Sequence, residues 1–181
     1  MATVITTCGN WASASNPGTV WSSDSSDPVS DIENLKDTVT GRIGRAPNTV
    51  VMGQKVWTAL RKHPDLLDRV KYVERGVLSP AAFRDIFGVE KLLIGTAIYN
   101  SAVEDAAASY SYIWGSNLWM GYVPGAATLM TPAAGYTLEW GARTVRQYRE
   151  EQEHADVFEA QHFTSEKVTA SDSGGGYYGV L

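Results

Sequence analysis

Residues 27–44 read DPVSDIENLKDTVTGRIG, and this stretch decides the fold that the sequence predicts. Its apolar residues recur at spacings of three and four, which puts them on one stripe of an α-helix: Val29, Ile32, Leu35, Val39 and Ile43. Asp27 is a favourable N-cap, Pro28 suits the first helical position, and glycines followed by a proline end the run. The sequence therefore predicts an amphipathic helix whose polar face meets water or a neighbour.

The next segment, residues 48–99, alternates predicted strands and helices. Its expected elements are a buried strand at Asn48–Gly53, helices at Gln54–His63, Leu66–Tyr72 and Ser79–Gly88, and a strand at Lys91–Tyr99. Pro64 stops or kinks the first of these helices, Ser79-Pro80 is a cap-plus-proline start for the third, and Gly88 closes it. This order indicates a compact α/β unit.

The remaining segments favour strands and irregular chain. We expect a hairpin of Tyr110–Trp114 and Leu118–Val123, a short strand at Tyr136–Trp140, and a long ribbon of Thr144–Glu151 with Asp156–Val168. The ribbon has polar residues on both faces, which is typical of strands that lie on another surface. Residues 1–26 are rich in serine and threonine and read as an extended or irregular arm whose tryptophans need a partner surface. Residues 171–176 read as flexible.

Composition limits the class of protein. The chain has 181 residues, a net charge of −5 and 44% hydrophobic residues, which suits one folded domain, or a domain with an arm. A single cysteine, Cys8, excludes an intramolecular disulfide framework and a multi-cysteine zinc site. No apolar stretch is long enough to span a membrane, and we expect a soluble, intracellular protein. Only residues 48–100 are net basic, with eight basic and five acidic side chains, which argues against a dedicated nucleic-acid binder.

The chemistry-bearing residues indicate no active site. His63, just before Pro64, is expected to cap the end of the preceding helix. His154 and His162 lie eight residues apart on one strand, about 26 Å at the rise of a β-strand, so one metal ion cannot bind both. Cys8 has no basic neighbour to activate it. The sequence thus predicts no catalytic, cofactor-binding or metal-binding residues, and four further tryptophans, Trp57, Trp114, Trp119 and Trp140, are expected in the core or in subunit contacts.

Several of these stretches resemble, in order, the major capsid proteins of tailed bacteriophages with the Hong Kong 97-type fold. The stretches are Ser26–Ile32, Gly44–Gly53, Val56–Asp65, Phe87–Ile94, Ile113–Gly115 and Thr131–Tyr136, followed by the ribbon. The resemblance implies an α+β fold: a spine helix at 27–47, an α/β axial domain at 48–135, and peripheral-domain strands with a long antiparallel ribbon at 136–170. Residues 1–26 would be an arm or a remnant of the extended loop, and residues 171–181 a C-terminal tail. Family members are longer and carry an N-terminal arm and an extended loop before the spine helix, so we expect a fragment lacking the arm and much of that loop.

The function implied by the resemblance is structural rather than enzymatic. Copies would form pentamers and hexamers of an icosahedral shell, with ring contacts from the loops Gly76–Pro80 and Tyr122–Thr131, contacts between rings from the ribbon and the spine helix, and partners outside the chain for its tryptophans. Expected partners are other copies, scaffold, protease or decoration proteins, and packaged DNA held only by weak non-specific contact, without a membrane. The protein would be assembled in the bacterial host cytoplasm and reside in the virion capsid.

One alternative stays open from the residues alone. It is a small hydrolase or ligand-binding α/β domain with a pocket near His63, Asp65 and Glu104. The absence of a nucleophile-elbow or phosphate-loop motif makes it the weaker reading.

Overall fold

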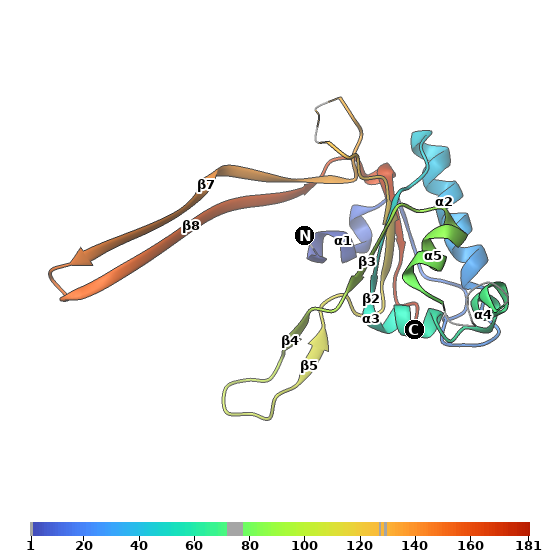
Figure 1. Ribbon diagram of the computed structural model, residues 1–181, viewed down its shortest axis with the longest axis horizontal. Helices are drawn as coiled ribbons and strands as arrows, with labels where there is room; N and C mark the ends of the chain where they lie inside the picture. The colour runs from blue at the N-terminus through green and yellow to red at the C-terminus, as the bar shows by residue number, and fades with distance from the viewer. Residues whose placement is uncertain (1, 72–77, 127, 129) are drawn as a thin grey trace.

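The computed structural model describes residues 2–71, 78–126, 128 and 130–181. A body made of a sheet and helices carries two projections, each a pair of strands (Figure 1). The α+β class is therefore confirmed. No helix in the described part of the chain is long and apolar enough to cross a membrane.

The body is built on a five-stranded mixed sheet in the order β1-β9-β6-β2-β3. Its strands are β1 (Ser13–Ser15), β9 (Gly174–Tyr177), β6 (Leu118–Gly121), β2 (Thr49–Gly53) and β3 (Lys91–Gly95). β2 pairs in parallel with β3, β1 pairs in parallel with β9, and β6 runs antiparallel to both of its neighbours. The predicted buried strand at residues 48–53 is confirmed as β2.

Four helices cover one face of the sheet: α2 (Pro28–Ile43), α3 (Gln54–Leu60), α4 (Pro64–Val70) and α5 (Pro80–Phe87). The predicted amphipathic helix is α2. The backbone N–H of Ser30 donates to the Asp27 carboxylate at 2.9 Å, and Gly44 ends the helix at φ 66°. The main core lies between these helices and the sheet and includes Ile32, Leu35, Val50, Met52, Leu60, Phe83, Phe87, Leu118 and Met120.

The N-terminal segment is part of the body, not an extended arm. It forms α1 (Ala2–Thr6), the short 3-10 helix η1 (Cys8–Asn10) and strand β1. Trp11 packs on Trp119 at 5.3 Å between ring centroids, on the sheet face opposite the helices, and Trp21 is 1% exposed in the main core. The expectation that these tryptophans need an outside partner is wrong, because this chain buries them.

The glycine-rich tail is also ordered, contrary to the sequence-based expectation. After a short 3-10 helix, η2 (Ser171–Ser173), residues 174–177 form β9 between β1 and β6. A side chain at Gly175 would come within 2.8 Å of Leu35 and Ser13, and one at Gly174 would come within 2.9 Å of the Trp11 and Trp119 rings. The glycines are there because neighbouring groups take the space, and flexibility is not their role.

The predicted hairpin of residues 110–123 does not form. β5 (Tyr110–Tyr112) pairs instead with β4 (Ile98–Asn100), while β6 joins the main sheet. The expected single strand at 91–99 is accordingly divided into β3 and β4, which belong to different sheets. We call residues 98–112, with β4, β5 and the loop between them, the finger.

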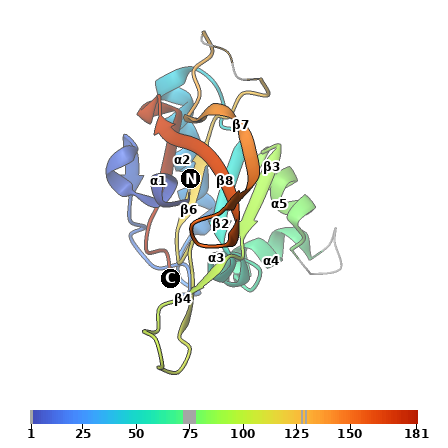
Figure 2. The same ribbon diagram turned by 90° about the vertical axis from the view of Figure 1, so that its left-hand side faces the viewer.

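The long ribbon is confirmed. It consists of β7 (Gly135–Glu150) and β8 (Ala155–Val168), which pair with each other and with no other described strand. The two strands expected within 136–151 are one strand with a register shift between Trp140 and Thr144. The ribbon extends far from the body (Figure 1), and Figure 2 looks along it toward the sheet.

Candidate assembly surfaces

One face of the ribbon carries a line of exposed apolar side chains. Trp140 and Phe163 are cross-strand partners and are 84% and 61% exposed, and the nearby Leu138 is 58% exposed. Strand alternation places Tyr148, at 49% exposure, farther along the same face. Large apolar side chains in contact with water over such a length are typical of a surface that another molecule covers.

The other face mixes apolar and charged side chains. Val145 and Phe158 are 75% and 69% exposed. An ion pair joins Arg149 to Asp156 at 3.2 Å across the strands, and His162 Nε2 lies 2.8 Å from the Glu139 carboxylate. These pairs hold the two strands in register, so the ribbon presents two defined surfaces.

The finger is a second exposed apolar element, which the sequence reasoning missed as a functional surface. Ile98, Tyr99 and Tyr110 are 54%, 51% and 67% exposed, and Val103 in the connecting loop is 77% exposed. One feature of the sequence could have indicated this surface: residues 92–142 contain no lysine or arginine, so the finger and its surroundings lack the basic side chains of an ordinary solvated surface.

The two loops expected to make ring contacts are only partly described. Gly76 and Val77 of the first loop lie outside the described residues; Leu78 is buried, and Ser79 caps α5. In the second loop, residues 127 and 129 lie outside the described part, while Met130 is 96% exposed. At its base the guanidinium of Arg45 lies over the Tyr122 ring at 5.4 Å and donates to its hydroxyl at 2.9 Å.

The outward face of α2 is polar, as its periodicity predicts. Asn34, Asp37, Thr38 and Arg42 are exposed there, and Arg42 forms an ion pair with Asp172 of η2 at 3.4 Å. Of the six tryptophans, Trp57 and Trp119 are buried like Trp11 and Trp21, Trp114 is half-buried, and Trp140 is exposed on the ribbon.

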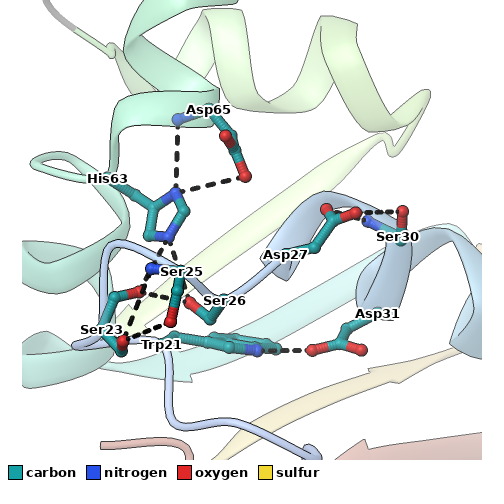
Figure 3. A network of polar contacts seen from close by, with 9 residues as sticks. All are labelled: Trp21, Ser23, Ser25, Ser26, Asp27, Ser30, Asp31, His63 and Asp65. Carbon is teal, nitrogen blue, oxygen red and sulfur yellow. Dashed lines mark hydrogen bonds and ion pairs between the residues drawn. The ribbon is translucent and has the colours of Figure 1, made fainter.

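His63 is a buried member of a polar network that reaches the surface (Figure 3). It is 3% exposed, and its Nδ1 accepts a hydrogen bond from the backbone N–H of Asp65 at 3.4 Å, which makes it the N-cap of α4. The expectation that it caps the end of the preceding helix is wrong, since α3 ends at Leu60.

The network brings together a serine, a histidine and an aspartate, but not as a catalytic triad. His63 Nε2 lies 3.1 Å from the Ser26 hydroxyl, which donates to the Ser23 carbonyl at 2.7 Å. His63 Nδ1 accepts the hydrogen bond from the Asp65 backbone N–H, and in that tautomer Nε2 is the donor, facing the Ser26 hydroxyl and the Ser23 carbonyl. The Ser26 hydroxyl proton is directed at the Ser23 carbonyl, whereas a general base would have to receive it. Ser26 is also buried, at 4% exposure. The group joins the segment before α2 to the α3–α4 corner.

The alternative pocket near His63, Asp65 and Glu104 does not form. Glu104 lies in the loop of the finger, which projects away from α4 (Figure 1). His154 lies in the turn at the end of the ribbon with φ 50°, and the described residues contain no group of histidines, cysteines or carboxylates suited to a metal ion. Cys8 is free and exposed.

Comparison with known proteins supports the resemblance to phage capsid proteins. The family model for phage major capsid protein E matches residues 13–156. The major capsid protein of Burkholderia phage BcepMu is 37% identical over 118 residues, which are 62% of this chain and 37% of that protein.

Two solved structures share the fold. A phage-related protein from Bordetella bronchiseptica RB50 superposes with a TM-score of 0.87 at 23% identity, over 97% of this chain and 60% of that one. A virus-like particle from Pyrococcus furiosus superposes with a TM-score of 0.55 at 11% identity, over 92% of this chain and 56% of that one. The chain thus spans less than two thirds of the length of each of these relatives. Since the family model covers most of the chain, including α2, the sheet strands β1, β2, β3 and β6, the finger and β7, the chain belongs to the phage major capsid protein E family.

Proposed function

We propose that this chain is the shell-forming part of a tailed-phage or prophage major capsid protein, which assembles into pentamers and hexamers of an icosahedral shell around DNA. The observation that carries the proposal is the ribbon, whose exposed aromatic residues have no partner surface among the described residues. The main core of the body contains no ribbon residue, and of the ribbon only Val168, at its root, packs against the second core cluster.

The physical argument is that an isolated two-stranded ribbon is marginally stable in water and gains stability when another surface covers it. Trp140 and Phe163, as cross-strand partners, place two large exposed aromatic rings side by side on this ribbon. Since the chain belongs to a family of major capsid proteins, the covering surface that we propose is another copy. Symmetry repeats one contact around each ring, so weak individual contacts add up through multivalency.

The domain assignment is part of the same proposal. α2, within residues 27–47, would be the spine helix, residues 48–135 the axial domain, and residues 136–170 the peripheral strands and ribbon. Residues 1–26 and 171–181 contribute β1 and β9 to the body sheet, so we assign them to the axial unit rather than to a free arm and tail. The exposed polar face of α2 supports a role, with the ribbon, in contacts between rings.

The proposed partners follow from the charge. A chain with a net charge of −5 holds packaged DNA only weakly, as an inner wall should. Scaffold, protease and decoration proteins remain candidate partners, with assembly in the host cytoplasm and residence in the virion. No bond is made or broken in this role. The Ser26 hydroxyl is buried and donates to the Ser23 carbonyl, which supports a structural rather than a catalytic role for this serine.

The test compares the chain with a variant in which an Asn-Gly turn replaces residues 138–165, which keeps the Thr137–Glu166 pair at the turn and removes the exposed apolar side chains of the ribbon. We expect the chain to form rings or shells in light scattering and electron microscopy, and the shortened variant to remain folded by circular dichroism but to associate much more weakly. A chain that stays monomeric at high concentration would contradict the proposal.

A further inference from the structure

A groove opens on the sheet face opposite the main helices, between α1, β3 and the root of β8. It encloses about 280 Å³, and its apolar walls include Ile5, Val51, Leu93 and Trp119. Figure 2 shows α1 and β3 on this side of the body. We call it the β3 groove.

The groove is open because β3 is an edge strand. Val51 and Leu93 are partners on neighbouring strands and point to the same face of the sheet. Val51 is 7% exposed because β6 and the N-terminal segment cover it, whereas Leu93 is 54% exposed. An aliphatic side chain entering here would cover Leu93 and continue an apolar layer that is already formed.

The rim of the groove is basic. Lys91 and Lys167 belong to its lining, which includes no aspartate or glutamate among the described residues. Neither lysine forms an ion pair with any described residue, in a chain whose acidic side chains outnumber its basic ones by five. The groove therefore fits a partner that combines an apolar side chain with carboxylates.

The tip of the finger has this chemistry. Val103 is 77% exposed and is followed directly by Glu104 and Asp105, which are also exposed. The finger itself contains no basic residue.

The finger tip is also held in shape before it meets a partner. Asn100 Oδ1 accepts hydrogen bonds from the backbone N–H groups of Ala102 at 3.1 Å and Ser109 at 2.9 Å. The N–H of Ser101 donates to the Ser109 carbonyl at 2.9 Å, which closes the neck of the loop. A loop ordered in advance loses less conformational entropy on docking.

We propose that the finger tip of one copy docks in the β3 groove of the next, with Val103 against Leu93, and Glu104 and Asp105 facing Lys91 and Lys167. The inference rests on the proposed function and names a contact through which it would operate. A chain cannot fill its own groove in this way, because β3 begins at Lys91 beside the groove and the finger leaves from the far end of that strand. The contact joins two different surfaces, so it continues from copy to copy and can close a ring.

The test is a charge exchange in the full chain. The finger variant carries Glu104→Lys and Asp105→Lys, and the groove variant carries Lys91→Glu and Lys167→Glu. Like charges then face each other in each variant alone, and we expect association to weaken by about tenfold or more. In an equal mixture, each finger meets a groove of opposite charge, so association returns. A matched control, Asp24→Lys with Asp85→Lys, makes the same charge change as the finger variant at exposed sites outside the contact and should associate like the unmodified chain.

The mixture makes a sharper prediction. Because only unlike variants can be neighbours, its rings must contain even numbers of subunits, which native mass spectrometry resolves. The docking is overturned if the two variants associate like the unmodified chain, or if the mixture fails to associate while each variant remains folded by circular dichroism. Those results leave the proposed function intact, whereas an unmodified chain that never associates overturns both.

Discussion

The indole Nε1 of Trp21 donates a 2.8 Å hydrogen bond to the carboxylate of Asp31 on α2. The same indole packs edge-on against Tyr177 of β9 at 5.8 Å, and the Trp21 backbone N–H donates to the Val180 carbonyl at 2.7 Å. One buried residue therefore joins the segment before α2, the helix and the C-terminal strand.

Trp21→Ala should destabilise the fold by about 3–5 kcal/mol, because it removes a fully buried aromatic ring and leaves Asp31 without its donor. Trp140→Ala removes a tryptophan side chain that is 84% exposed, and it should change the free energy of unfolding of the monomer by less than about 0.5 kcal/mol. Urea unfolding at a concentration where the chain is monomeric measures both. Equal losses of stability in the two variants would contradict the burial of Trp21 or the exposure of Trp140.

Gly175→Ala should destabilise by about 1–3 kcal/mol, since its Cβ would come within 2.8 Å of Leu35 and of Ser13. Gly41→Ala is the matched control, because this helical glycine of α2 has no atom within 4 Å of a built Cβ. It should stabilise the protein by about 0.5–1 kcal/mol through its helix propensity. Thermal unfolding of the two variants should therefore move in opposite directions.

Asp27→Ala should cost about 1 kcal/mol through loss of the α2 N-cap. The hydrogen bond from the Ser30 hydroxyl, 2.6 Å, and that from the Ser30 backbone lower the pKa of Asp27 below its usual 3.8. Because the folded-state value is the lower one, the contribution is complete above about pH 4 and is lost as the pH falls through the folded pKa. The difference in the free energy of unfolding between the two proteins should narrow as the pH falls below about 4, and a difference that grows in acid would contradict the assignment.

Alkaline pH should weaken the fold through Tyr178, whose pKa burial raises to about 12, with a smaller contribution from Cys8. Its hydroxyl donates to the Ile5 carbonyl at 3.3 Å. The folded state keeps this proton when the unfolded state has lost it, so stability is complete below pH 10 and falls as the pH rises from about 10 toward 12. Tyr178→Phe should flatten this decline, measured by urea unfolding across that range, whereas Tyr110→Phe at an exposed site should leave it unchanged.

The sequence was sufficient where the signals are local. Asp27 with Pro28, and Ser79 with Pro80, mark the starts of α2 and α5, and Gly44 and Gly88 end them at φ 66° and 60°. The ribbon was also predictable, because a residue-by-residue alternation over two long runs indicates strands even where polar side chains occur on both faces.

Strand partners were less predictable, because pairing is decided by residues far apart in the chain. The turn-like residues 115–117 favoured a local hairpin, yet Trp119 pairs with Val51 of β2 and with Gly176 of β9. Three glycines in a row suggested flexibility, since a sequence does not show that two indole rings occupy the space beside them. The contact between Ser26 and His63 could not be predicted either, because 37 positions separate these residues in the chain.

The two strands that bracket the ribbon, β6 and β9, are neighbours in the sheet. The ribbon is thus an insertion within the connection between two adjacent strands, and a change in its length leaves the strand pairing of the sheet unchanged. Two residues added to each strand would preserve which side chains share a face and lengthen the ribbon by about 7 Å. The distance at which one subunit reaches another could therefore change during evolution in even steps while the body keeps the same architecture.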